Sequence, residues 1–207
     1  MILISSGPTR EPLDPVRFLT NASSGAMGFA LAAAAKASGA RVVVVSGPTH
    51  RTPPAGVAVV RVTTALEMRR EVLRRVARAH AVIGAAAVTD WRAPRVAAHK
   101  IKRYPASLRL TLVPNPDIIK DAAARRRPGQ VFVGFALETR RAATLDYARA
   151  KLVGKGLDLV VANGSDALAS DRIRATLVGR GWTRRLPSQP KSRVARIVVA
   201  EVVRLLA

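Results

Sequence analysis

Short runs of β-branched residues alternate with longer helical patterns along most of this chain of 207 residues. The clearest strand is Arg41–Ser46, whose four consecutive valines are typical of a parallel strand that is covered on both faces. Because strands and helices follow one another in turn, the pattern predicts an α/β fold with a doubly wound, mostly parallel, Rossmann-like sheet. The other strands are expected at Ile2–Ser5, Val57–Val62, Ala81–Val88, Val131–Phe135 and Leu157–Ala162.

Helices are predicted between and after these strands. The best marked one opens at Thr63 or Thr64, carries the acidic Glu67 in its first turn and runs to about Arg78. A turn at Asn115–Ile118 opens a further helix. The remaining helices are expected at Ala26–Ser38, Arg140–Val153 and Ser192–Leu206.

The C-terminal part of the chain has a different pattern. Ile173–Val178 and Trp182–Leu186 flank a turn at Gly179–Gly181, which predicts an antiparallel hairpin. Since we find no internal repeat and no long linker, residues 1–207 are expected to form a single domain.

One segment, Arg92–Pro114, interrupts the alternation. It contains three prolines and an alternating stretch, Leu108–Leu112, which predicts a strand. Such an excursion from a compact domain is usually functional, so we expect a dimerisation arm or a binding segment.

Composition excludes several kinds of protein. The chain has no cysteine, which excludes a disulfide scaffold, a thiol nucleophile and metal sites built on thiolates. With only three histidines, a histidine-rich metal centre is excluded too. The first residues carry no basic leader and the apolar runs are far shorter than a bilayer span, so we expect a cytoplasmic protein without membrane contact.

The formal net charge is +22, from 35 basic and 13 acidic residues. Such a field attracts phosphate and makes nucleic acid an obvious partner. The basic residues are scattered between apolar segments, however, and 28 of the 35 are arginines. Aromatic residues that could stack on bases are scarce. We therefore interpret most of the charge as solvated helix faces, with a nucleic-acid surface as the alternative.

The loop after the first strand ends in a serine- and glycine-rich turn, Asn21–Gly28, that leads into a helix. Backbone N–H groups at a helix start attract anions, so Ser23, Ser24 and Gly25 are candidate contacts for a substrate phosphate. The turn matches neither the GxGxxG nor the Walker pattern. The plainer alternative is an ordinary helix that Ser23 or Ser24 caps.

The end of the Ala81–Val88 strand is a second candidate site. Small side chains there would let a flat ligand approach the backbone, and Asp90 could hold Mg²⁺ or a sugar hydroxyl. The alternatives are tight packing of a helix on the sheet and a capping role for Asp90. Phe135, at the end of its strand, is either an aromatic face for a base or plain core.

Four of the seven lysines fall in two short windows, Lys100 with Lys102 and Lys151 with Lys155. A compact ammonium group suits phosphate oxygens, which favours these lysines as phosphate contacts. The alternative is that each window is a solvated face.

Taken together, these segments resemble the bacterial phosphopantothenate–cysteine ligases of coenzyme A biosynthesis. The resemblance covers essentially the whole chain, in the same order. It rests on Gly7–Arg17, Thr20–Gly25, Ser46–Thr49, Ala85–Asp90, Lys100–Arg103, Asn115–Ile118, Gly134–Thr139 and Leu157–Asn163.

The resemblance implies a ligation in two steps, with Mg²⁺ on the phosphates. The carboxylate of 4′-phosphopantothenate attacks the α-phosphate of CTP, releasing pyrophosphate, and the amine of L-cysteine then displaces CMP from the acyl-cytidylate. Catalytic positions are implied at Asn21, Arg17, Lys100 and Ala87. The implied contacts to CTP are Gly84, Ala85, Ala86, Asp90, Lys100, Pro116, Asp117, Ile118, Ile119, Phe135, Lys151 and Lys155, with Asp90 as the candidate Mg²⁺ ligand.

The same resemblance implies a homodimer in which the Arg92–Pro114 excursion reaches toward the partner copy. We also expect a stand-alone ligase whose flavin-dependent decarboxylase is a separate chain. Ala26 stands where the family usually has lysine, so one potential phosphate contact is missing. The alternatives are the same reaction with ATP, a basic nucleic-acid-binding α/β protein, and a nucleotide-binding scaffold without catalysis.

Overall fold

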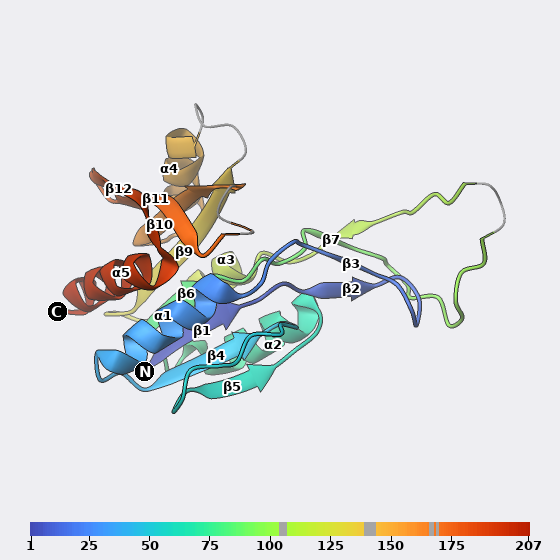
Figure 1. Cartoon of the computed structure of the whole chain (residues 1–207), viewed down its shortest axis with the longest axis horizontal. Coiled ribbons are helices and arrows are strands. Elements are labelled where there is room, and N and C mark those ends of the chain that lie inside the picture. Colours follow the sequence, from blue (N-terminus) through green and yellow to red (C-terminus); the bar gives the residue numbers. More distant parts are fainter. Residues whose placement is uncertain (104–106, 139–143, 166–167, 169) are drawn as a thin grey trace.

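An eight-stranded sheet forms the centre of the computed structural model, which describes residues 1–103, 107–138, 144–165, 168 and 170–207 (Figure 1). Its strand order is β12-β11-β10-β9-β6-β1-β4-β5, and all neighbours from β10 to β5 are parallel. This is the doubly wound order, in which the winding of the chain reverses between β1 and β6. The strands are β1 (Ile2–Ser6), β4 (Val42–Ser46), β5 (Ala58–Arg61), β6 (Ala81–Gly84), β9 (Val131–Glu138), β10 (Leu159–Gly164), β11 (Arg172–Gly179) and β12 (Trp182–Pro190).

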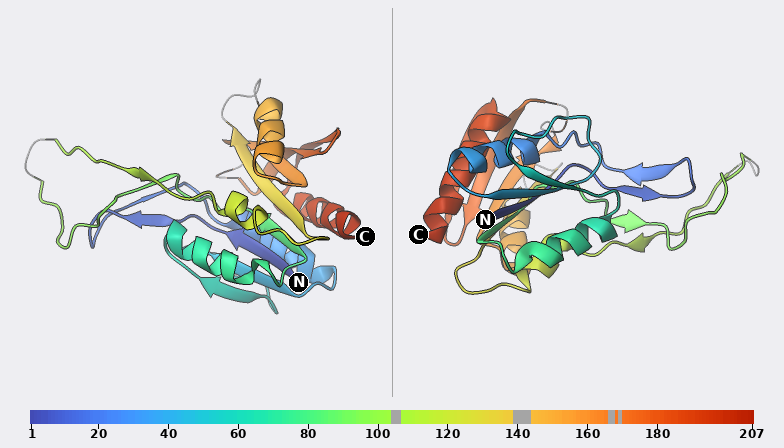
Figure 2. Two further views of the ribbon diagram at one scale, coloured as in Figure 1. Left: turned by 180° about the vertical axis from the view of Figure 1, so that it is seen from behind. Right: turned by 90° about the horizontal axis from the view of Figure 1, so that it is seen from below.

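Helices cover both faces of this sheet, and they are α1 (Ala26–Ala37), α2 (Ala65–Val76), α3 (Ile118–Ala123), α4 (Thr144–Gly154) and α5 (Lys191–Leu206). Helices α1 and α5 lie side by side on one face, and α2, α3 and α4 lie on the other (Figures 1 and 2). Along β1, Ile2 and Ile4 pack toward α1 while Leu3 packs toward α2, and all three are buried. In the part of the chain that the structure describes, no helix combines the length and apolar character needed to cross a bilayer.

Two antiparallel strand pairs project from the sheet as an arm (Figures 1 and 2). Strand β2 (Arg10–Pro12) pairs with β3 (Phe18–Thr20), and β7 (Trp91–Arg92) pairs with β8 (Val113–Pro114). We call residues 10–20, 91–103 and 107–114 the arm. The predicted excursion is therefore accompanied by a second segment, contributed by the loop after β1.

One buried carboxylate joins the two segments of the arm. Asp14 accepts the N–H groups of Val16 and Arg17, each at 2.8 Å, and the N–H of Ile101 at 3.1 Å across the arm. The Arg17 guanidinium lies 3.4 Å from the same carboxylate and donates to the Ile101 carbonyl oxygen. Desolvation raises the pKa of Asp14, but these hydrogen bonds and the charge of Arg17 outweigh it and hold the pKa below its usual range.

The predicted fold class, the helix start at Thr64 and the C-terminal hairpin are confirmed. The Thr64 hydroxyl accepts the N–H of Glu67 at 3.2 Å, and the Glu67 carboxylate accepts the N–H of Thr64 in return. Strands β11 and β12 pair through a turn at Gly181, which has φ 77°. Strands β9 and β12 extend further than predicted, and β10 is shifted by two residues toward the C-terminus. For α4, the predicted residues 140–143 lie outside the described residues.

Two strand predictions are wrong in extent or existence. Strand β6 ends at Gly84. The neighbouring strand β1 ends at Ser6, and the chain turns at Gly7, which has φ 74°. Beyond this point Ala87 forms only an isolated bridge to Pro8. Leu108–Leu112 forms no strand, and its alternate leucines at 108 and 110 are 52% and 44% exposed. The strands that the arm does contain, β2, β3, β7 and β8, are each two or three residues long and were not predicted.

Candidate functional site

A cavity of about 530 Å³ lies at the carboxyl ends of β1 and β6, where the winding of the sheet reverses. Open α/β sheets bind ligands at this point because the loops on either side diverge and leave a crevice. The walls come from the loops after β1 and β6, from β9 and β10, and from the first turns of α1, α3 and α5. The volume is typical of a site for a small molecule.

The N-terminus of α1 forms one wall of this cavity. Its N-cap is Gly25, with φ 74°, no side chain caps the helix, and its first turn has no acidic residue. The predicted N-cap at Ser23 or Ser24 is wrong, because Gly25 occupies that position. The Ser23 hydroxyl accepts the Gly25 N–H at 3.3 Å, and the Ser24 hydroxyl accepts the N–H of Ala26, the first helical residue, at 3.4 Å. The helix therefore opens with N–H groups and a positive dipole end that suit an anion.

The second wall is built mainly from main chain. Residues Gly84–Ala87 carry no side-chain atom beyond Cβ, so their backbone borders the cavity. The Ala85 N–H donates to the Ser5 carbonyl oxygen at 3.1 Å, and the Ala87 N–H donates to that of Gly7 at 2.9 Å. These bonds hold the loop against the end of β1, with its main chain next to the cavity.

Asn21 connects these two walls. Its Nδ2 donates to the carbonyl oxygens of Ala87 and Val88, at 3.3 and 3.0 Å. The next carbonyl oxygen along the same loop, that of Thr89, accepts Nδ2 of Asn115 at 2.7 Å. Two amide side chains from different parts of the sequence therefore brace the loop after β6.

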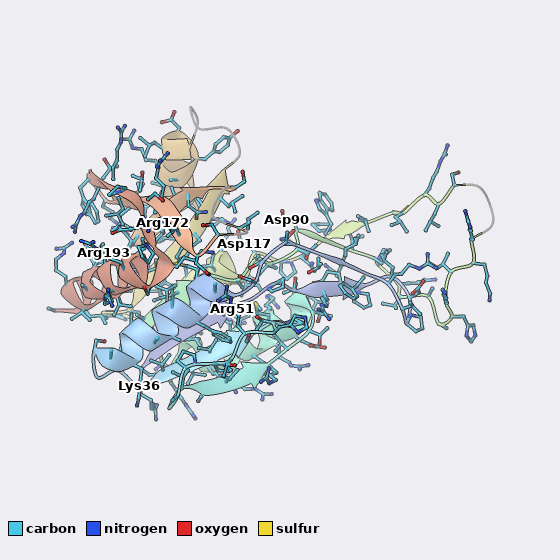
Figure 3. The ribbon with its side chains drawn as sticks, in the orientation of Figure 1. Lys36, Arg51, Asp90, Asp117, Arg172 and Arg193 are labelled. Atoms are coloured by element: carbon cyan, nitrogen blue, oxygen red, sulfur yellow. The ribbon has the colours of Figure 1, made fainter. Side chains whose placement is uncertain are left out.

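The third wall carries an aromatic ring and two lysines. Phe135 lies on β9, and Lys151 donates to its carbonyl oxygen. The Lys155 ammonium lies 2.5 Å from the carboxylate of Asp117, which also caps α3. Asp117 and Asp90, both labelled in Figure 3, line the same cavity. Both ammonium groups thus have protein oxygens as partners.

Most of the predicted contacts line this one cavity. Gly25 does not line it, but provides the N-cap of α1 beside it. Arg17 and Lys100 lie on the arm, outside the cavity. The predicted residues that the cavity brings together are Asn21, Ser23, Ser24, Gly84, Ala85, Ala86, Ala87, Asp90, Pro116, Asp117, Ile118, Ile119, Phe135, Lys151 and Lys155.

The cavity also has lining residues that the sequence reasoning missed. Asn163 on β10 and Lys191 at the start of α5 are two of them. Lys191 is 9% exposed, and burial lowers its pKa, a shift that Asp171 opposes and Arg51 reinforces. The available signal was a lysine directly before the predicted helix Ser192–Leu206, close to a helix start that disfavours a cation.

Of the residues that the structure describes along the cavity, Asp90 and Asp117 carry carboxylates, and that of Asp117 is already paired with Lys155. Among the described residues, no three histidine, aspartate or glutamate side chains gather as a metal cluster. Asp90 is an exposed carboxylate on the cavity wall. Because Mg²⁺ is usually bound through one or two carboxylates together with substrate phosphates, the site fits a Mg²⁺ ion that arrives with a nucleotide.

The sequence matches a known family along its length. The family described as the DNA/pantothenate metabolism flavoprotein C-terminal domain matches residues 1–206. The chain is 42% identical over 209 residues to the coenzyme A biosynthesis bifunctional protein CoaBC of Escherichia coli K12, covering 98% of this chain and 51% of that protein. For CoaBC of Bacillus subtilis 168 the identity is 40% over 210 residues, with 99% and 51% covered. The chain thus spans about half the length of these curated relatives.

Solved structures share the fold. The C-terminal domain of a coenzyme A biosynthesis bifunctional protein CoaBC has a TM-score of 0.84 at 36% identity, covering 99% of this chain and 94% of that one. The DNA/pantothenate metabolism flavoprotein from Streptococcus pneumoniae has a TM-score of 0.85 at 22% identity, covering 98% of each chain, which is a likeness of fold alone. Sequence and structure agree, and the chain belongs to the family of the DNA/pantothenate metabolism flavoprotein C-terminal domain.

Proposed function

We propose that this chain joins 4′-phosphopantothenate to L-cysteine with CTP, in the biosynthesis of coenzyme A. The observation that carries the proposal is the cavity at the carboxyl ends of β1 and β6, in which a helix start suited to phosphate and an aromatic side chain suited to a base border one space. The coenzyme A proteins that are 40% and 42% identical to this chain support the same assignment.

The proposed reaction has two displacement steps. A carboxylate oxygen of 4′-phosphopantothenate forms a bond to the α-phosphorus of CTP, and the bond from that phosphorus to its bridging oxygen breaks to release pyrophosphate. The amine nitrogen of cysteine then bonds to the acyl carbon and loses a proton, while CMP leaves with the electron pair of the broken carbon–oxygen bond. Neither step requires a nucleophile from the protein, so positioning and charge stabilisation would supply the catalysis.

The geometry suggests how the substrates would lie. The base would lie against Phe135 and the main chain of Gly84–Ala87, and the phosphates would reach the N-terminus of α1. Asn21, which connects the two walls, would hold the mixed anhydride with an uncharged amide that does not attack it. Asp90 would hold Mg²⁺, which neutralises phosphate charge when it is bound.

Arg17 and Lys100 require a different explanation, because they lie on the arm. The arm also exposes six large apolar side chains, which is typical of a surface that another protein covers. We therefore include a homodimer in the proposal, with each arm bringing Arg17 and Lys100 to the cavity of the other copy. The exposed side chains are Val16, Phe18, Trp91, Val96, Leu108 and Leu110.

The proposal is tested by incubating the purified protein with Mg²⁺, 4′-phosphopantothenate and cysteine, and measuring pyrophosphate release with CTP, ATP, GTP and UTP in parallel. We expect pyrophosphate with CTP, dependent on 4′-phosphopantothenate, and amide product when cysteine is present. Release with ATP alone would replace CTP by ATP in the same reaction. No release with any of the four nucleotides would reject the ligase and favour a binding protein.

A further inference from the structure

A lysine opens helix α5 at a position that is unfavourable for a cation. Lys191 follows the N-cap Pro190, where the helix dipole is positive, and the first turn of α5 has no acidic residue. The residue is 9% exposed. Burial of an ammonium group at a positive helix end costs free energy unless an anion compensates it.

Asp171 connects Lys191 with a second cation. The Lys191 N–H donates to the Asp171 carbonyl oxygen at 2.9 Å, and the Asp171 carboxylate lies 3.1 Å from the guanidinium of Arg51. Burial is the main cause that lowers the pKa of Lys191; the charge of Arg51 adds to this shift and the charge of Asp171 opposes it. The edge of the cavity at Lys191 thus combines a buried ammonium group with a nearby guanidinium.

Lys191 and the start of α1 border the same cavity. Ala26 and Met27 of α1 line it together with Lys191, so the positive ends of two adjacent helices converge there. Phe135 and the ion pair of Lys155 with Asp117 line the same space. In the proposed placement the base lies against Phe135 and the phosphates reach the start of α1, where Lys191 also lines the cavity.

We propose that Lys191 binds the β- and γ-phosphates of the nucleotide and neutralises the charge of the pyrophosphate that leaves. This inference rests on the proposed function and adds a residue to the same site. When the carboxylate oxygen bonds to the α-phosphorus, the electron pair of the breaking bond stays on pyrophosphate. Lys191 keeps its proton throughout and acts as a charge-assisted hydrogen-bond donor.

The test compares nucleotides that differ only in their phosphate tail. The full chain is titrated calorimetrically with CTP, CDP and CMP, and with the corresponding adenine nucleotides, as wild type, Lys191→Met and Lys191→Arg. Lys191→Met should weaken CTP and CDP binding by about 10- to 100-fold, the range expected for one charged hydrogen bond, and leave CMP binding nearly unchanged. Lys191→Arg should retain most of the preference for CTP over CMP because it retains the charge.

The matched control is Lys36→Met, because Lys36 is an exposed lysine at the opposite end of α1 (Figure 3). It should bind every nucleotide like the wild type. If Lys191→Met does not fold by circular dichroism, Lys191→Gln replaces it in the same titrations. A variant that keeps the wild-type ratio of CTP to CMP affinity, or that loses both nucleotides equally, overturns the role of Lys191. A wild-type protein that binds none of the nucleotides rejects the proposed function as well.

Discussion

Asn21 braces the loop after β6 and also borders the cavity. Its Nδ2 holds the carbonyl oxygens of Ala87 and Val88, while the residue itself borders the cavity. A carboxylate of the same size at this position would face two carbonyl oxygens without a proton to share. The loop after β6 would then lose its brace at the reacting centre.

We therefore expect Asn21→Asp to lower turnover by about 100-fold or more, the range for loss of a preorganised donor. CTP binding should fall much less, because the base and phosphate contacts lie elsewhere in the cavity. Initial rates of pyrophosphate release and calorimetric titration with CTP measure the two effects. Wild-type turnover in this variant would remove Asn21 from the mechanism.

Gly28 illustrates how closely α1 approaches β1 below the cavity. A Cβ atom added at Gly28 would lie 2.1 Å from Oγ and 2.4 Å from Cβ of Ser6. We expect Gly28→Ala to lower the free energy of unfolding by about 1–3 kcal/mol through overpacking. Gly154→Ala is the matched control, since a Cβ there meets no atom within 4 Å. Urea denaturation of both variants checks the prediction, and equal stabilities would contradict it.

The charge of Asp14 contributes to joining the two segments of the arm. Because the pKa of Asp14 is held below its usual range, its contribution to stability is present above the ordinary aspartate pKa and is lost as the pH falls through the lowered value. Asp14→Asn removes that contribution at all pH values. The difference in unfolding free energy between the wild type and Asp14→Asn should therefore be largest at neutral pH and shrink toward about pH 3. A difference that stays constant over this range would contradict the assignment.

The buried elements were predictable because burial leaves a strong trace in the sequence. The valines of β4 and the apolar residues of β1 point alternately to the two faces of the sheet, and helices cover both faces. A continuous apolar run in the sequence therefore indicates each of these strands directly. The arm leaves no such trace. Strands β2 and β3 are three residues long and include Pro12. Isolated hydrogen bonds hold them in place, such as that from the Arg10 N–H to the Thr63 carbonyl oxygen and that from the Ala65 N–H to the Glu11 carboxylate.

The candidate site was predictable wherever loops follow strands of the sheet. Asn21, Asp90 and Phe135 meet because parallel strands place their carboxyl ends at one edge. Lys191 could not be found in this way, since it comes from a helix start that the antiparallel hairpin β11–β12 carries back to that edge. The sequence around Lys191 does not show that the hairpin brings this helix start to the cavity.

The position of the arm makes a prediction for the assembled molecule. In the proposed dimer, Arg17 of one copy serves the cavity that contains Asn21 of the other. A heterodimer of Arg17→Ala and Asn21→Ala chains then has one intact site and one site with both substitutions. We expect such a heterodimer, isolated with two different affinity tags, to show about half the wild-type activity, although each homodimer is nearly inactive. Without recovery in the heterodimer, each cavity would have to work with its own chain alone.

The wall formed by Gly84–Ala87 has a consequence for how this protein is studied. Three of its four residues are already alanine, so alanine scanning leaves them unchanged and cannot report on a wall whose contacts come from main chain. Only substitutions that enlarge a side chain can test the function of such a wall. Valine or leucine at these positions would fill the space meant for a flat ligand, and a map of functional residues drawn from truncations would leave this part of the site blank.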